Sequence, residues 1–337
     1  MSNNQIIRML CAIGVTGAGV CAAQASADAA VIRVPADQPT VQAAVDAAED
    51  GDMIKVGPGR WCGATIDREV HLVGQWGTTI EGCAEMLQPF GLRAGFVLVD
   101  ARASGTSIRG FRFDGAGIST SNTDPIGLAI IGRDAHGVSV TGNRIEGTTQ
   151  GITNTGGDGW LIAGNVIRDL TIFGCVVQPG RCGGGVGIVV QQRDVAADRA
   201  FGNVIMFNDV SGATPDGLSI VYLAGVFVLG QDHPFIAFNR IAIPANPNAT
   251  ADAIGINVSD VCCGDPTPLP TTRHAVIVHN DGRATPTAVQ VDRDASNGTG
   301  NSQGAVIRHN LGVVRVNGAV VSSLAKAGPQ PSPVPFD

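Results

Sequence analysis

The chain has 337 residues, including 46 glycines and a single tyrosine, and only 15% of its residues are charged. This composition suits many short strands joined by tight turns and argues against an architecture of long helices. A formal net charge of -7 without runs of Lys or Arg argues against nucleic acid or an anionic membrane surface as the partner. No apolar run reaches the ~18 residues of a membrane-spanning helix, so no membrane insertion is expected.

Residues 1–27 are predicted to be a secretory signal peptide and not part of the fold. Arg8 precedes a weakly apolar stretch from Met9 to Ala23, and small-x-small cleavage sites follow at residues 23–25 and 25–27. The alternative is an uncleaved membrane anchor, which so short and glycine-rich a segment would serve poorly. We therefore expect a secreted or periplasmic protein of the bacterial type.

One amphipathic helix is expected, within residues 37–48. Apolar residues recur with helical spacing from Val41 to Ala48, Thr40 stands at the N-cap position, and Gly51 follows as a stop. Such a helix ahead of a strand domain would cover its exposed first edge.

A short apolar strand, an asparagine and a second short strand then recur six times. The asparagines of the six copies are Asn143, Asn165, Asn208, Asn239, Asn280 and Asn310. A fixed element that returns every 20 to 45 residues indicates a solenoid. We expect the asparagines to take the left-handed conformation at a bend and to stack from coil to coil. The gaps of 43 and 41 residues hold either one coil with an insertion or an additional coil.

Early segments carry a family resemblance. The predicted helix, residues 51–56 (Gly-Asp-x-Ile-x-Val), residues 57–59 (Gly-Pro-Gly) and residues 72–74 (Leu-Val-Gly) resemble the opening of pectin-lyase-like superfamily proteins. This resemblance implies an all-β fold, a right-handed parallel β-helix with a short N-terminal capping helix, over residues 28–322. Each coil would contain three short strands. Residues 323–337 would form a Pro-rich C-terminal tail.

The cysteines outside the signal segment favour disulfide bonds. They are Cys62, Cys83, Cys175, Cys182, Cys262 and Cys263. An even number in an oxidising compartment suggests bridges, and we predict Cys62–Cys83, about one coil apart, and Cys175–Cys182, which bracket a short loop. Cys262 and Cys263 would form a vicinal bridge or stay free. Metal binding is the rival interpretation, but no C-x-x-C or H-x-x-x-H pattern accompanies them.

Polar residues follow the third strand of nearly every coil, beside a groove that long loops would wall over the third-strand sheet. We assign Arg193 as a substrate clamp, Asp194 or Asp232 as the proton-transfer group and His233 as an alternate base. The remaining predicted substrate-binding residues are Arg133, Asp134, Gln192, Gln231 and Arg293. The alternative is a solvated ladder in which Arg and Asp pair between coils, each pair contributing under ~1 kcal/mol.

Other polar patterns give weaker signals. His279 and His309 precede equivalent asparagines, a position that Phe207 and Phe238 occupy in other copies, so packing on neighbouring coils is favoured over a metal site. No metal site is predicted. The resemblance offers precedent for Ca²⁺ bound by corner aspartates, but no loop of alternating carboxylates supports it.

Two function classes follow. The first and leading one is an exported carbohydrate-active protein, a polysaccharide lyase, hydrolase or epimerase with a glycan substrate. The second is a non-catalytic periplasmic or cell-surface module that binds a glycan or protein partner, similar to the β-helical accessory proteins of copper-enzyme maturation. Residues 122–124 (Asn-Thr-Asp) look like the first motif of polygalacturonases, yet its companion motifs and the arginine signature of pectate lyases are absent. The sequence therefore leaves enzyme and binding module open.

Overall fold

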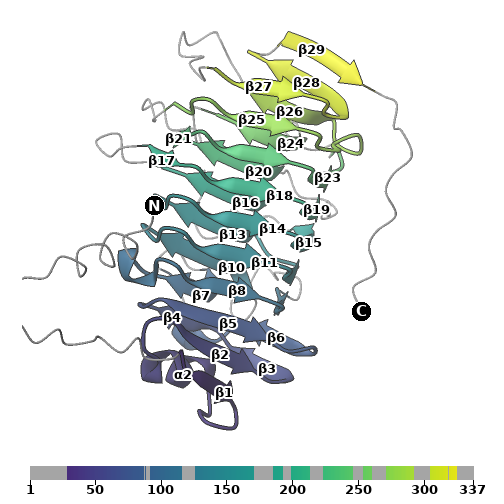
Figure 1. Cartoon of the computed structure of the whole chain (residues 1–337). Helices are drawn as coiled ribbons and strands as arrows, with labels where there is room; N and C mark the ends of the chain where they lie inside the picture. Colours follow the sequence, from purple (N-terminus) through teal and green to yellow (C-terminus); the bar gives the residue numbers. More distant parts are fainter. Residues whose placement is uncertain are drawn as a thin grey trace, which may run out of the picture.

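The computed structural model describes residues 29–86, 88, 92–115, 126–170, 185–192, 199–212, 223–245, 253–259, 271–291, 304–317 and 319–324. Over these residues the chain winds as an all-β parallel β-helix from the α2 end to the β29 end (Figure 1). A typical coil contributes one strand to each of three sheets, which we name sheets I, II and III in the order in which the chain visits them. The predicted fold class is confirmed.

Sheet I is wholly parallel and, within the described residues, has ten strands. They are β1 (Val31–Val34), β2 (Asp52–Val56), β5 (Val70–Gly74), β8 (Ser107–Arg109), β11 (Ser139–Thr141), β14 (Leu161–Ala163), β18 (Val204–Met206), β22 (Phe235–Ala237), β25 (Val276–Val278) and β27 (Val306–Arg308).

Sheet II is also parallel, with seven strands in the described part of the chain. They are β3 (Gly59–Cys62), β6 (Thr78–Glu81), β9 (Arg112–Asp114), β12 (Arg144–Glu146), β15 (Val166–Leu170), β19 (Asp209–Gly212) and β23 (Arg240–Ala242).

Sheet III contains the predicted third strands and ends in an antiparallel pair, β28 with β29. Its strands are β4 (Ala64–Ile66), β7 (Arg93–Leu98), β10 (Ile126–Arg133), β13 (Gln150–Thr155), β16 (Val186–Gln191), β20 (Leu223–Leu229), β24 (Ala253–Val258), β26 (Thr287–Val291), β28 (Gly312–Val316) and β29 (Ala319–Leu324). The short elements are β17 (Ala200–Phe201), which pairs with β21 (Gln231–Asp232), and the 3-10 turns η1 (Ala84–Met86) and η2 (Ala101–Ala103).

The pairing register resolves the two long gaps in the repeat. Ile162 of β14 pairs directly with Ile205 of β18, so the 43-residue gap is one coil with an insertion. Ile236 of β22 pairs in the same way with Ile277 of β25 across the 41-residue gap. Between these directly paired strands of the described chain, neither gap holds an additional coil.

The repeated asparagines form one continuous buried ladder at the corner between sheets I and II. The backbone N–H and side-chain NH₂ of each asparagine donate to the amide oxygen of the next, over 2.9–3.1 Å, from Asn143 to Asn310. The predicted stacking is confirmed. Because these amides are buried, the ladder satisfies polar groups that water cannot reach.

The predicted left-handed conformation of these asparagines is wrong. The residue before each asparagine takes it instead, with φ between +56° and +65°. Those residues are Gly142, Gly164, Phe207, Phe238, His279 and His309. The reason is that the asparagine's own N–H must point along the ladder, so the sharp turn is completed one residue earlier.

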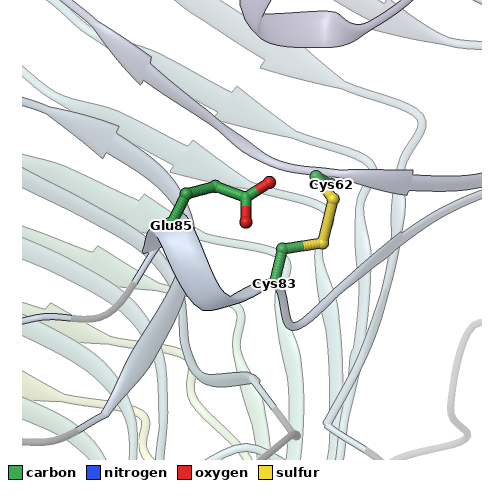
Figure 2. A group of neighbouring side chains, drawn as sticks. All are labelled: Cys62, Cys83 and Glu85. Atoms are coloured by element: carbon green, nitrogen blue, oxygen red, sulfur yellow. A yellow bond between two sulfur atoms is a disulfide. The ribbon is translucent and has the colours of Figure 1, made fainter.

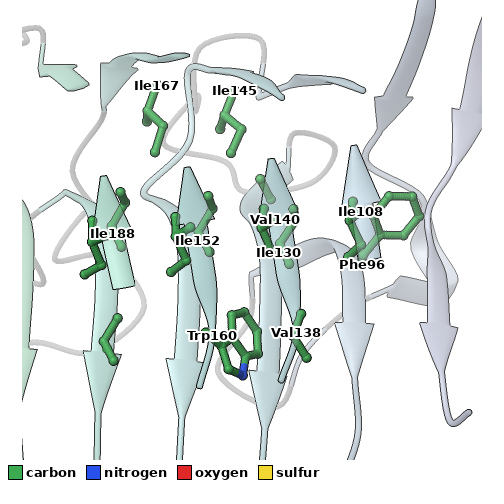
Figure 3. Packing of buried hydrophobic residues seen from close by; sticks show 14 of the residues in the cluster. Phe96, Ile108, Ile130, Val138, Val140, Ile145, Ile152, Trp160, Ile167 and Ile188 are labelled. Atoms are coloured by element: carbon green, nitrogen blue, oxygen red, sulfur yellow. The ribbon is translucent and has the colours of Figure 1, made fainter. Parts of the chain in front are cut away.

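The core is a stack of like residues between the three sheets. Val140, Ile162 and Ile205 follow one another along sheet I, all fully buried. Ile145 and Ile167 of sheet II face Ile130, Ile152 and Ile188 of sheet III, and Trp160 fills the corner (Figure 3). Burial of these side chains at every coil is the main stabilising contribution.

Helix α2 (Val41–Ala47) covers the N-terminal end of the solenoid, as predicted (Figure 1). The Thr40 side chain accepts from the Ala43 N–H over 3.1 Å, and Val41, Ala44 and Val45 pack against the first strands. Among the described helices, none is long and apolar enough to cross a membrane.

The predicted disulfide Cys62–Cys83 is present and links β3 to the segment after β6 (Figure 2). Glu85 lies near the two sulfurs, but both thiols are consumed by the bond and cannot serve as thiolate ligands. The second predicted bridge, Cys175–Cys182, and the Cys262–Cys263 pair lie outside the described residues.

Candidate functional site

The groove predicted over sheet III is not open in the structure. The outward-facing side chains of its central strands are at most 7% exposed. They are Val97, Ile131, Thr153, Val189, Phe227, Asn257 and Gln290. At the N-terminal end, Met86 and Leu92 form a second apolar cluster with Val97 and Ile131. These outward side chains are therefore covered, and the site predicted over sheet III stays a prediction.

Three of the predicted site residues, Arg193, Asp194 and Arg293, lie outside the described residues. Gln231 is fully buried: its Oε1 accepts from Asn203 Nδ2 over 2.6 Å, and its Nε2 donates to the Leu229 carbonyl over 3.2 Å. The side chain is enclosed and its hydrogen bonds hold the coil corner, and its role in substrate binding stays a prediction. Gln192 is also buried.

Arg133 and Asp134 lie far from the remaining predicted residues. The Arg133 guanidinium donates to Gln88 Oε1 over 3.4 Å, and Asp134 is exposed with a left-handed backbone. Both lie three coils before Asp232, which corresponds to ~14 Å along the axis. The structure does not bring these residues together with Asp232 and His233.

Asp232 and His233 do meet a third side chain, His274 of the next coil. Asp232 Oδ1 lies 2.9 Å from the Nδ1 atoms of both His233 and His274. The two imidazoles stack with ring centroids 4.4 Å apart. His274 was missed by sequence reasoning, although a signal exists: two copies of the repeat begin with His, at His233-Pro-Phe-Ile and at His274-Ala-Val-Ile.

The electrostatics of this cluster follow from its partners. Burial acts to raise the pKa of Asp232, but the hydrogen bond from His274 and the positive charges that His233 and His274 can carry outweigh it. The pKa of Asp232 therefore lies below its usual range. Both histidine rings remain about half exposed, so ions and solvent reach the cluster.

The backbone at this corner is unusual. His233 and His274 have φ of +54° and +52°, at a position that most neighbouring coils fill with glycine. The equivalent glycines, each with positive φ, are Gly105, Gly137, Gly159 and Gly202. An L-residue in this conformation costs about 1–2 kcal/mol. The histidines of these two consecutive coils therefore take a backbone conformation that they do not favour by themselves.

A second column of side chains runs along the other end of the sheet I strands. Phe207, Phe238, His279 and His309 stack face to face with centroids 4.9–5.2 Å apart and ring planes within 12° of parallel. The predicted packing of these four residues on neighbouring coils is confirmed. All four are exposed, Phe207 at 57% and Phe238 at 45%.

Between the two columns, the outward side chains of sheet I are apolar in the C-terminal coils. One row is Leu161, Val204, Phe235, Val276 and Val306, and the next is Ala163, Met206, Ala237 and Val278, which Arg308 follows in the last coil. Leu161 and Val306 are 38% and 39% exposed. Proteins rarely leave several neighbouring large apolar side chains exposed to solvent. We call these two rows, with the Phe207–His309 column, the apolar face.

Comparisons with known proteins support the fold only. No protein-family model and no curated protein matches the chain. The crystal structure of PfbA, a surface adhesin of Streptococcus pneumoniae, is similar with 14% identity and a TM-score of 0.50, covering 81% of this chain and 74% of that one. A second structure of that surface protein and adhesin matches with 10% identity and a TM-score of 0.40, covering 79% and 78%. At this identity the likeness shows a shared β-helix, and membership of the pectin-lyase-like superfamily is not established.

Proposed function

We propose that the chain is an exported, non-catalytic surface module that binds a protein partner on the apolar face of sheet I. The observation that carries this proposal is the continuity of that face. Five consecutive coils, from Leu161 to Val306, point apolar side chains outward at one register position. Scattered apolar residues on a surface are ordinary, whereas a continuous patch bordered by polar residues marks an interaction site.

The conformational cost of the Phe207–His309 column supports the proposal. Gly142 and Gly164 show that the corner can be built from glycine, which takes the left-handed conformation without strain. Phe207 and Phe238 take the same conformation at about 1–2 kcal/mol each and leave large rings in water. Stacking offsets part of this cost, and contact with a partner would supply the rest.

A protein suits this face better than a glycan. The rings of Phe207, Phe238 and His279 cover one another's faces, so their edges point outward and sugar stacking has no free platform except at the ends of the column. From Leu161 to Val278 the two rows offer no side-chain hydrogen-bonding group, and in the last coil the exposed Arg308 is the one such group in register, whereas a glycan needs many. The face measures about 19 Å along the axis by about 10 Å along the strands, or roughly 190 Å², a size that suits the apolar centre of a protein interface.

The carbohydrate-active alternative depends on a groove over sheet III, where the outward side chains are buried. Asp232 and His233 remain accessible, but they pair with His274 and not with the predicted arginine clamp. One solved structure with a similar fold is described as a surface adhesin. We extend to this chain the general role of binding at a surface, without its ligand.

The test is site-specific photo-crosslinking in the bacteria that produce the chain. Benzoylphenylalanine at Val276, within the apolar face, should give a discrete cross-linked protein that is identified by mass spectrometry. The matched control is Lys55, which faces outward on β2 of the same sheet near the N-terminal end, and it should give none. A second copy of this chain in the band would identify the partner as the chain itself.

Three results would contradict the proposal. They are equal bands from Val276 and Lys55, a product that glycosidases digest, and the absence of any Val276 product. The double variant Phe207→Gly with Phe238→Gly sharpens the test, since it restores the residue used by earlier coils and should abolish the Val276 product without unfolding the chain. Unsaturated products from a panel of uronic-acid polymers would favour the enzyme instead.

A further inference from the structure

The cluster of Asp232, His233 and His274 is not needed for the apolar face and has a chemistry of its own. The three side chains offer one carboxylate oxygen and two imidazole nitrogens that all lie within 4.8 Å of one another. This donor set suits divalent transition metals such as Zn²⁺, Ni²⁺ and Cu²⁺, because imidazole is a borderline-soft ligand that these ions prefer. We propose that Asp232, His233 and His274 form a binding site for such an ion.

The distances are close to those that coordination requires. Ligand bonds of about 2.0–2.1 Å around a tetrahedral ion place neighbouring donor atoms about 3.3 Å apart. Asp232 Oδ1 lies 2.9 Å from each of the two Nδ1 atoms, so an ion would take the place of the protons that these atoms share. Binding then needs a small outward shift of the rings and no change of backbone.

The surroundings hold both rings in place before any ion arrives. The Phe201 ring packs against His233 with centroids 5.4 Å apart on one side of the pair. On the other side Gly304 approaches the His274 ring so closely that a Cβ there would lie 2.9 Å from it. The left-handed backbones of His233 and His274 aim both rings at the same carboxylate. Such support limits the ordering that binding would otherwise require.

A second pair of stacked histidines shows what is special about this cluster. His279 and His309 stack at 4.9 Å and also have left-handed backbones. Within the described residues, no carboxylate joins them to make a group of three ligands. They therefore serve as an internal control for imidazole stacking without coordination.

Three protein ligands leave at least one coordination position open to solvent. Because both histidines are about half exposed, we expect an exchangeable site and not a closed structural one. Copper(II) should bind most tightly among the divalent ions of the first row. Neither the fold nor the apolar face depends on the ion, so the site can fail while the proposed function stands.

The experiment uses the full chain without a polyhistidine tag, freed of metal by chelation. Calorimetric titration with CuCl₂ and with ZnCl₂ should show one equivalent of each metal bound, and the copper EPR spectrum should show nitrogen coupling. His274→Gly installs the residue that neighbouring coils use, and Asp232→Asn keeps the size of the side chain. Each should weaken affinity by at least about tenfold, whereas the control His279→Gly should leave it unchanged.

Circular dichroism with chelator present checks that each variant remains folded. If His274→Gly does not fold, Asp232→Asn decides the outcome by itself. The proposal is overturned if the wild-type chain binds neither metal, if Asp232→Asn binds copper as tightly as the wild-type chain, or if His279→Gly loses as much affinity as the cluster variants.

Discussion

Two halves of sheet I follow the same backbone path with different side chains. In the earlier coils the residue before each ladder asparagine is glycine, as at Gly142 and Gly164, whereas Phe207, Phe238 and His279 occupy it later. The outward rows differ too: they mix polar and apolar residues in the early coils, as at Lys55, Val73 and Arg109, and are apolar from Leu161 to Val306 except at Arg308. The left-handed backbone of the corner is therefore common to the coils of the solenoid, whereas the side chain at that position varies from coil to coil.

The largest effect on stability is expected at the junction of the two halves of sheet I, from the variant Asn208→Ala. This change leaves the Asn165 N–H and NH₂ without their acceptor and removes the donors to the Ile162 and Met206 carbonyls. Buried groups left unpaired should lower the free energy of unfolding by about 3 kcal/mol. Urea denaturation measures it, with the exposed Arg308→Ala as control. A loss no larger than that of the control would contradict a structural ladder.

An intermediate effect on stability is expected when the residue before a ladder asparagine is exchanged between glycine and phenylalanine. Gly142→Phe forces a bulky side chain into φ +61° without a stacking partner, and should cost about 1–2 kcal/mol even though nothing obstructs a Cβ there. The reciprocal Phe238→Gly should change stability by less than about 1 kcal/mol, because relief of strain offsets lost stacking. Thermal melts of the two variants test this. A large loss from Phe238→Gly would assign the aromatic column to stability instead of binding.

The smallest effect concerns ion pairs at the corners. The guanidinium of Arg283 hydrogen-bonds Asp281 and, although burial opposes it, holds the pKa of that carboxyl below its usual range. Because the folded pKa is the lower one, the stabilisation is present above the unfolded pKa of about 3.9 and is lost as pH falls through the folded value.

Asp281→Asn should therefore lower the melting temperature at pH 7, and the difference from the wild-type chain should shrink in strongly acidic buffer. The matched pair in the N-terminal half is Asp100 with Arg102, which is more exposed, so Asp100→Asn should have the weaker effect. A difference that grows on acidification would contradict this assignment.

Much of the fold was predictable because it rests on local and repeated signals. The asparagine spacing predicted the ladder, the Thr40 cap and helical periodicity predicted α2, and the one-coil separation of Cys62 and Cys83 predicted their bond. The left-handed residue was misplaced by one position, because either neighbour can complete a sharp turn and only the direction of the ladder N–H decides which.

The candidate site was only partly predictable. Asp232 and His233 were chosen for their ionisable groups, but their partner His274 follows His233 by 41 residues. Insertion lengths differ from coil to coil, so spacing alone does not reveal which side chains become neighbours. No metal site was predicted because the sequence does not show that His274 lies beside Asp232 and His233.

The sequence by itself determined that the chain is a solenoid of short strands with a capped N-terminal end and asparagine corners. Each of these features depends on residues close together in the chain and on the spacing of the repeat. Only the tertiary structure decided which faces are covered. The outer side chains of sheet III are buried although the sequence suggested an open groove, and His233 stacks on His274 of the next coil, 41 residues later. Contacts between coils, and not local preference, therefore determine which side chains remain exposed on sheet I and at its two corners.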